Sequence, residues 1–275
     1  MTSMLPATVN IRLEREGAVL RLWLNRPETR NALSPDMVRE IQAAFDAIRD
    51  DRSIRVVVIR GAGGTFCAGG DIKNMQMAGA ALAPGAVDEV KAGNRRYGAM
   101  LQTINEAPQA TITVVEGAAM GGGIGFASVA DITIAMADAQ FAMTEVMLGI
   151  VPAAISPFVV RRIGLTAARR FAVTGARLSG VDACVVGFAH QVVTDASALD
   201  DEISAAIDQV LKCAPGAVAE TKRLMQRAAT AMPMPELLDH AAESFAAAVR
   251  SLEGREGTAA FIEKRKPNWV QKAGS

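Results

Sequence analysis

Residues 116–126 read EGAAMGGGIGF and follow the run TITVV at residues 111–115. An earlier stretch has the same order, because VVVI at residues 56–59 leads into GAGGTFCAGGD at residues 61–71. The unbroken apolar run VVVI is typical of a strand that is buried on both faces of a sheet. Since both runs end in glycine-rich segments, the sequence predicts a layered α/β body with a glycine-rich loop at the end of each strand.

The pattern around these loops predicts further strands and helices. Residues 19–24 (VLRLWL) predict a strand, and Ser34 followed by Pro35 predicts the start of a helix that ends near Arg49. We also predict a short helix at 126–129, strands at 132–136 and 190–193, helix starts at Ser156 and Thr166, and a helix end at Gly187. Because no strand is convincing beyond Asp195, we expect residues 1–200 to form the core and residues 201–275 a helical C-terminal region.

The composition excludes several classes of protein. The chain has 275 residues, 50% of them hydrophobic and 21% charged, which is enough to bury one large core. Its 29 basic and 29 acidic residues cancel, so no overall positive field favours a nucleic acid or an anionic membrane surface as partner. Three separated cysteines and two histidines predict neither a disulfide framework nor a metal site. Charged residues interrupt the N-terminal apolar stretch, and we expect a cytoplasmic protein without a membrane span.

The two glycine-rich loops can bind a ligand through their backbone. Glycine lets N–H groups approach a ligand closely, and a helix that starts inside the loop at residues 117–125 would favour a developing negative charge. Two such loops that face one another could form an oxyanion hole from backbone alone. The alternative is that both loops are tight turns required for close packing. Neither loop contains GxGxxG or a P-loop motif, which argues against a nucleotide site.

Glu145 is the candidate acid–base residue. It lies in QFAMTEVMLGIVP at residues 140–152, an almost wholly apolar setting. Desolvation there would raise the pKa of the carboxyl group towards the range that suits general acid–base catalysis. The alternative is a carboxylate satisfied by backbone N–H groups at the end of a strand or helix. The two histidines, His190 and His240, do not suggest a catalytic triad, because no serine occupies a GxSxG motif.

Five segments together resemble the enoyl-CoA hydratase/isomerase (crotonase) superfamily, in the order and at about the intervals of that family. They are LNRPETRNAL (24–33), FCAGGDIKNM (66–75), EGAAMGGGIGF (116–126), AQFAMTEVMLGIVP (139–152) and GTAAFIEKRKPNW (257–269). The resemblance covers nearly the whole chain. PAAISPFVVRRIG (152–164) and RKPNWVQ (265–271) also resemble bacterial methylglutaconyl-CoA and isohexenylglutaconyl-CoA hydratases.

The resemblance implies a crotonase-type spiral of ββα repeats and a C-terminal helical region used in trimerisation, giving a homotrimer or a dimer of trimers. It implies that Glu145 is the catalytic residue and that the amides of Gly70 and Gly122 form the oxyanion hole. It also implies that no cofactor is bound permanently, because coenzyme A would enter as part of an acyl-CoA substrate. The CoA-binding positions that it implies are Ala68, Asp71, Ile72, Lys73, Phe261 and Lys264.

One position departs from the family. Gly125 stands where family hydratases often carry the first of two glutamates, so this chain supplies one catalytic carboxylate, Glu145. Glu145 could move both protons through one water, or another group, or the substrate's own distal carboxylate, could orient that water. We expect Gly125 to leave space near C3 of the acyl chain, which suits a branched substrate.

The resemblance therefore predicts an acyl-CoA lyase that adds water to the 2,3-double bond of an enoyl-CoA thioester, in particular a branched glutaconyl-CoA. One alternative is a Δ3,Δ2-enoyl-CoA isomerase, in which Glu145 alone shuttles a proton between C2 and C4. Another is a non-catalytic protein of the same fold that binds acyl-CoA or RNA. The balanced charge, with one tyrosine and two tryptophans for base stacking, argues against RNA.

Overall fold

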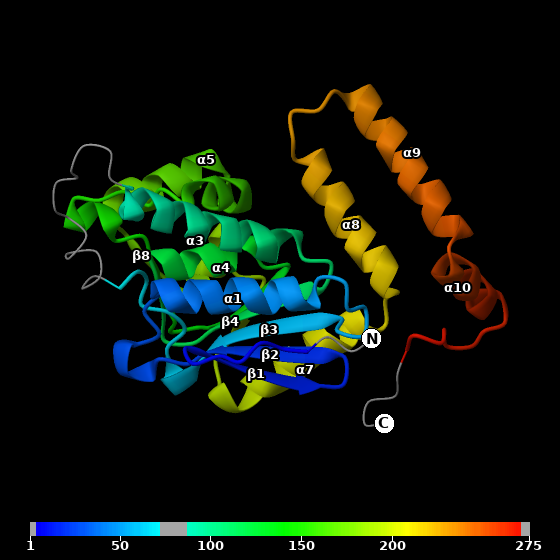
Figure 1. The fold of residues 1–275 in the computed structure, drawn as a ribbon, viewed down its shortest axis with the longest axis horizontal. Coiled ribbons are helices and arrows are strands. Elements are labelled where there is room, and N and C mark those ends of the chain that lie inside the picture. The colour runs from blue at the N-terminus through cyan, green and yellow to red at the C-terminus, as the bar shows by residue number, and fades with distance from the viewer. Residues whose placement is uncertain (1–3, 72–86, 271–275) are drawn as a thin grey trace.

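The computed structural model describes residues 4–71 and 87–270, and a large twisted sheet lies at its centre (Figure 1). The sheet has six strands in the order β1-β2-β3-β4-β6-β9. Only β1 runs antiparallel to its neighbour, and the other strands are parallel. The strands are β1 (Ile11–Glu16), β2 (Val19–Leu24), β3 (Val56–Gly61), β4 (Ala110–Val115), β6 (Ile132–Met136) and β9 (Gln191–Val193).

A second, smaller sheet stands beside the first. It contains β5 (Ala118–Met120), β7 (Gln140–Ala142) and β8 (Arg177–Ser179). Strands β4 and β5 are followed by α4 (Gly122–Val129), and strands β6 and β7 are followed by α5 (Ser156–Thr174). Each of these turns gives one strand to the large sheet, a short strand to the small sheet and a helix. The predicted fold class, a spiral of ββα repeats, is confirmed.

Helices cover both faces of the large sheet. Val57 and Ile59 point into a core shared with α1, α3, α4 and α5, whereas Val56 and Val58 point into a second core shared with α7. The run VVVI is apolar throughout because successive strand residues face opposite cores. The remaining helices of the body are α1 (Pro35–Ile48), α3 (Glu89–Glu106), α6 (Gly180–Val186) and α7 (Leu199–Leu211), with short 3-10 helices η1 (Pro27–Thr29), η2 (Ala62–Gly64), η3 (Glu145–Leu148) and η4 (Ala196–Ala198).

The local signals in the sequence account for most element ends. Ser34 caps α1 by accepting a hydrogen bond from the Met37 amide, and Gly187 ends α6 with a φ of 96°. Helix α5 begins at Ser156 as predicted, and it is broken at Gly164, where φ is 73°, so that Thr166 falls in its second part. The sequence prediction missed β1, α3 and the small sheet.

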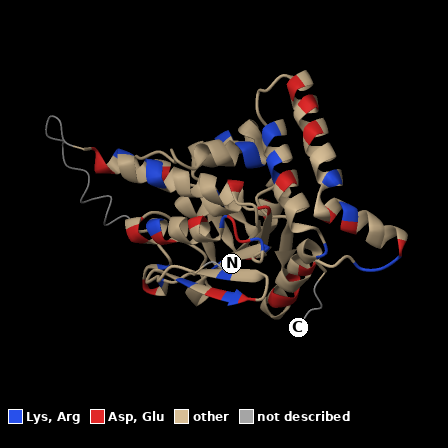
Figure 2. Cartoon of the chain, turned by 45° about the vertical axis from the view of Figure 1, so that its right-hand side comes forward, with Lys and Arg blue, Asp and Glu red and all other residues tan. Residues whose placement is uncertain are grey.

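Helices α8 (Pro215–Ala228), α9 (Met234–Arg250) and α10 (Leu252–Ile262) form an arm at one end of the body (Figure 1). Helix α8 lies against the body, because Lys222 Nζ donates to the Gln109 carbonyl oxygen and to Asp131 Oδ2, each at 2.7 Å. Helix α9 has no buried residue, and charges of both signs are spread along α8 and α9 (Figure 2). The predicted division at residue 200 falls inside α7, and it stays a prediction.

No described helix combines the length and the apolar character that crossing a membrane requires.

We expect Lys222→Met to loosen α8. The side chain is 11% exposed, and its loss leaves the Asp131 carboxylate without its cation. The free energy of unfolding should fall by about 1–3 kcal/mol. Hydrogen exchange should speed up in α8 more than in the sheet. Arg223→Met on the same helix is the control, since that side chain is 61% exposed. Equal exchange in the two variants would contradict this account of how α8 is held.

Candidate active site

The two glycine-rich loops lie directly against one another. The Cys67 amide donates to the Ala118 carbonyl at 2.8 Å, and the Met120 amide donates to the Cys67 carbonyl at 2.9 Å. Gly69 has a φ of 91°, and a Cβ there would stand 2.9 Å from the Met120 carbonyl oxygen. Only glycine allows both this conformation and this approach. The loops therefore face one another, as an oxyanion hole formed by both of them requires.

Gly70 and Gly122 flank the side chain of Leu33. The Leu33 amide donates to Gly69 at 2.8 Å, and the Asp71 amide donates to Leu33 at 3.2 Å, so Gly70 lies opposite Leu33 in a short parallel bridge. A Cβ on Gly122 would stand 2.8 Å from Leu33 Cδ1. Within the described parts of the chain, neither the Gly70 nor the Gly122 amide has a hydrogen-bond acceptor.

Helix α4 begins at Gly122, inside the second loop and four residues before the short helix predicted at 126–129. Gly70 and Gly122 are half-buried, whereas Gly69, Gly121 and Gly123 beside them are buried. The first turn of a helix has free N–H groups and the positive end of the helix dipole. A carbonyl oxygen that reached the Gly122 amide would therefore be stabilised as it gained negative charge.

Glu145 lies next to this helix start. It is the first residue of η3, and its Oε1 is 2.9 Å from the position that a Cβ on Gly121 would occupy. Burial raises the pKa of the Glu145 carboxyl group above its ordinary value, although a hydrogen bond from its own amide opposes this. Its Oε2 is buried and has no hydrogen-bond partner among the described residues. Its own amide thus satisfies the carboxylate only in part, and Oε2 is left without a donor among the described residues.

The space beside Gly125 is filled. A Cβ at Gly125 would stand 2.5 Å from Tyr97 Oη, 2.7 Å from Leu101 Cδ1 and 3.1 Å from Ile155 Cγ2. The Tyr97 hydroxyl also donates a hydrogen bond to the Gly122 carbonyl oxygen. The expectation that Gly125 leaves open space near the acyl chain was wrong, because the only tyrosine of the sequence occupies that space.

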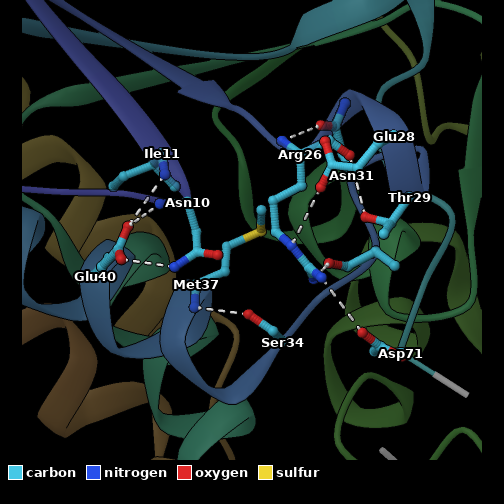
Figure 3. Close-up of polar contacts among 11 residues, drawn as sticks. Asn10, Ile11, Arg26, Glu28, Thr29, Asn31, Ser34, Met37, Glu40 and Asp71 are labelled. Carbon is cyan, nitrogen blue, oxygen red and sulfur yellow. Dashed lines mark hydrogen bonds and ion pairs between the residues drawn. The ribbon is translucent and has the colours of Figure 1, made fainter. Parts of the chain in front are cut away.

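Asn31 holds the loop at residues 26–33 against the first glycine-rich loop. It is fully buried, its Oδ1 accepts from the Arg26 amide at 2.9 Å, and its Nδ2 donates to the carbonyls of Ala62 at 2.9 Å and Thr65 at 2.7 Å. Figure 3 shows Asn31 beside Arg26, whose guanidinium reaches Asp71 at 3.5 Å. The side chains of Asn31 and Arg26 therefore hold the loop that carries Gly70 in place.

The residues predicted to bind CoA fall into three groups. Ala68 and Asp71 belong to the loop that carries Gly70, and the Ala68 amide donates to the Arg30 carbonyl at 2.9 Å. Ile72 and Lys73 lie outside the described residues. Phe261 and Lys264 lie at the end of α10. In Figure 1, α10 and β8 are at opposite ends of the molecule. Strand β8 pairs with β7, the strand that precedes Glu145. This chain therefore does not bring the third group together with Glu145.

Sequence reasoning missed Tyr97, Asn31 and Leu33 as residues of the site. Asn31 and Leu33 stand inside the quoted segment LNRPETRNAL, but nothing in that segment indicates which loop they contact. Tyr97 lies in α3, a helix that was not predicted. Its being the chain's only tyrosine is the one signal that could have drawn attention to it.

A partly desolvated carboxylate near backbone amides that have no acceptor among the described residues is typical of enzymes that move a proton next to a carbonyl group. The amides would stabilise the charge on the carbonyl oxygen while the carboxylate accepts or donates the proton. The described residues contain no cluster of histidine, cysteine and carboxylate side chains that could hold a metal ion.

The chain belongs to the enoyl-CoA hydratase/isomerase family, whose model matches residues 14–272. It is similar to the crystal structure of an enoyl-CoA hydratase/isomerase from Marinobacter aquaeolei, with 48% identity and a TM-score of 0.91 over 95% of this chain and 99% of that one. The structure of Pseudomonas aeruginosa AtuE gives 48% identity and a TM-score of 0.91 over 96% and 100% of the two chains. A putative enoyl-CoA hydratase from Thermus thermophilus is 31% identical over 92% of this chain and 98% of its own length.

The names of these three relatives specify no acyl group. The family assignment from the five sequence segments is confirmed, whereas the narrower resemblance to glutaconyl-CoA hydratases stays a prediction.

We expect Asn31→Ala to destabilise the protein. The change leaves the Ala62 and Thr65 carbonyls without their donor, and it places alanine at a φ of 56°. The free energy of unfolding should fall by about 2–4 kcal/mol in denaturant titrations. Asn10→Ala, in which the lost side-chain donor contacts Glu40 at the edge of the body (Figure 3), is the control and should cost less. A smaller loss for Asn31→Ala than for the control would contradict the role assigned to Asn31.

We expect Glu145→Gln to stabilise the protein at neutral pH. Burial raises the pKa of the folded carboxyl group above its ordinary value of 4.5, so the folded protein binds more protons than the unfolded chain just above that pH. The stability of the wild type therefore falls as the pH rises through this range. The variant should have a higher melting temperature than the wild type at pH 7, and this gain should vanish when the pH is below the ordinary pKa of the carboxyl group.

Glu16→Gln, at a side chain that is 80% exposed, should give no such gain. A Glu145→Gln variant that is less stable than the wild type at pH 7 would show that the ionised Glu145 carboxylate does not lower the stability of the folded protein.

Proposed function

We propose that the protein adds water to the 2,3-double bond of an enoyl-CoA thioester and that its substrate is a branched glutaconyl-CoA. One observation carries the proposal of hydration. The Glu145 carboxylate lies against Gly121, and within the described residues the neighbouring Gly122 amide has no acceptor and the buried Glu145 Oε2 has no partner. A carboxylate in this position can accept a proton, and the amides can donate hydrogen bonds to a carbonyl oxygen.

The reaction follows from these two groups. The thioester oxygen accepts hydrogen bonds from the amides of Gly70 and Gly122, which lowers the energy of an enolate. Glu145 accepts one proton from water as the water oxygen bonds to C3 and the electron pair of the double bond moves towards the thioester. Glu145 then gives its proton to C2. The carboxylate ends as it began, and the product has gained one hydrogen and one hydroxyl.

The branched glutaconyl substrate is the narrower part of the proposal. It rests on the resemblance of residues 152–164 and 265–271 to the glutaconyl-CoA hydratases. Gly125 does not add support, because Tyr97 fills the space beside it. The coenzyme A part of the substrate would contact Ala68 and Asp71 in the loop that carries Gly70.

We also propose that the active enzyme is a homotrimer or a dimer of trimers. Helix α9 has no buried residue in one chain, and Leu238, Phe245 and Leu252 on the arm are 61%, 72% and 79% exposed. Burying such side chains is favourable, and contiguous exposed apolar patches mark interaction sites. Phe261, which is 86% exposed, and Lys264 would then reach the CoA site of a neighbouring subunit.

The isomerase alternative keeps one observation in its favour. The Glu145 carboxylate lies against Gly121 at the start of α4, and a single carboxylate can shuttle a proton between C2 and C4 of a 3-enoyl-CoA. This reaction uses the same two amides and needs no water. The two activities differ in the mass of the product.

A panel of CoA thioesters tests the proposal. The wild type should add one water to 3-methylglutaconyl-CoA, as detected by mass spectrometry, and Glu145→Gln should lower that rate at least about 100-fold while still binding acyl-CoA. Glu16→Gln is the matched control and should keep full activity. Isomerisation in D2O with no gain of water would assign the alternative activity. If the Glu145→Gln variant kept its turnover, neither hydration nor isomerisation could be assigned to Glu145.

A further inference from the structure

We propose that the Tyr97 hydroxyl holds the attacking water beside Glu145 and so does the work of the second carboxylate that this chain lacks. The inference rests on the proposed hydration and deepens it, because it assigns the group that orients the water. Helix α3 supplies this residue from outside the two glycine-rich loops.

The hydroxyl lies over the face of α4 from which a glutamate at position 125 would project. Tyr97 Oη is 2.5 Å from the Cβ position of Gly125 and 3.5 Å from that of Gly122. Positions 122 and 125 are three residues apart in the helix and share one face. The same hydroxyl donates to the Gly122 carbonyl, which fixes its orientation. The tyrosine oxygen thus occupies space that the side chain of a glutamate at position 125 would need.

Two hydrogen-bond acceptors at the site have no donor among the described residues. A tyrosine hydroxyl has one donor and two acceptor positions, and Tyr97 uses its donor on Gly122. No described residue donates to its oxygen, and Glu145 Oε2 is buried and also lacks a donor. These two acceptors lie against the consecutive glycines 121 and 122. One water that donates a proton to each would satisfy both and keep a lone pair for C3.

The two acceptors differ in their acidity, which divides their tasks. Burial raises the pKa of Tyr97 well above its ordinary value, and the charges of Cys67 and Glu145 add to the increase. Tyr97 therefore stays neutral and does not accept a proton. Glu145 takes the proton from the water, and the tyrosine keeps the water in line with C3.

Tyr97→Phe tests the assignment because it removes only the hydroxyl. The variant should hydrate crotonyl-CoA and 3-methylglutaconyl-CoA about 10- to 100-fold more slowly in kcat, with KM changed less than about 3-fold. Exchange of the α-protons of butyryl-CoA in D2O needs the amides and Glu145 but no water at C3. That exchange should stay within about 3-fold of the wild type, whereas Glu145→Gln should lose both reactions.

Three results would overturn the assignment. Unchanged hydration of crotonyl-CoA would mean that another group of the protein orients the water, and unchanged hydration of 3-methylglutaconyl-CoA alone would assign that task to the substrate's distal carboxylate. An equal loss of hydration and exchange would mean that Tyr97 acts only by supporting Gly122. A wild type that exchanges α-protons but hydrates no thioester would refute the proposed hydration itself. Thermal unfolding verifies that the variant folds, and Tyr97→Met is a second variant without the hydroxyl, to which the same readings apply.

Discussion

The pairing of the two glycine-rich loops is the constraint on which the site depends. Hydrogen bonds between Cys67 and residues 118 and 120 hold the loops together, and the approach at Gly69 leaves no room for a side chain. Each loop leaves a parallel strand of the large sheet, so the register of β3 against β4 sets where the loops meet. Within the described residues, this backbone geometry leaves the amides of Gly70 and Gly122 without an acceptor. No side chain has to move to present them.

A second constraint is electrostatic. Glu145 is partly desolvated, and its buried Oε2 has no hydrogen-bond partner among the residues that the structure describes. Such a carboxylate lowers the stability of the folded chain at neutral pH, and it persists here because the surrounding packing outweighs that cost. The same desolvation makes the carboxyl group a better proton donor and acceptor near neutral pH. The desolvation of Glu145 thus lowers the stability of the folded chain while it favours acid–base catalysis.

Local signals allowed much of the fold to be predicted. The runs at residues 19–24 and 56–59, the Ser34 cap and the stop at Gly187 each act through neighbouring residues, and each was predicted correctly. Strand β1 was missed because it is an edge strand whose charged residues face solvent. Strands β5, β7 and β8 have three residues each, too few to leave a periodic pattern. The role of Tyr97 could not be predicted, because it depends on contacts between α3 and α4, which no local pattern encodes.

The close fit between Gly125 and Tyr97 has a consequence for the history of the sequence. A side chain introduced at position 125 would collide with the tyrosine, and removing the tyrosine first would open a cavity at the head of α4. Recovering a second carboxylate thus requires two coordinated substitutions, each costly without the other. The two positions are coupled, and a lineage that has exchanged glutamate for this pair would tend to retain it.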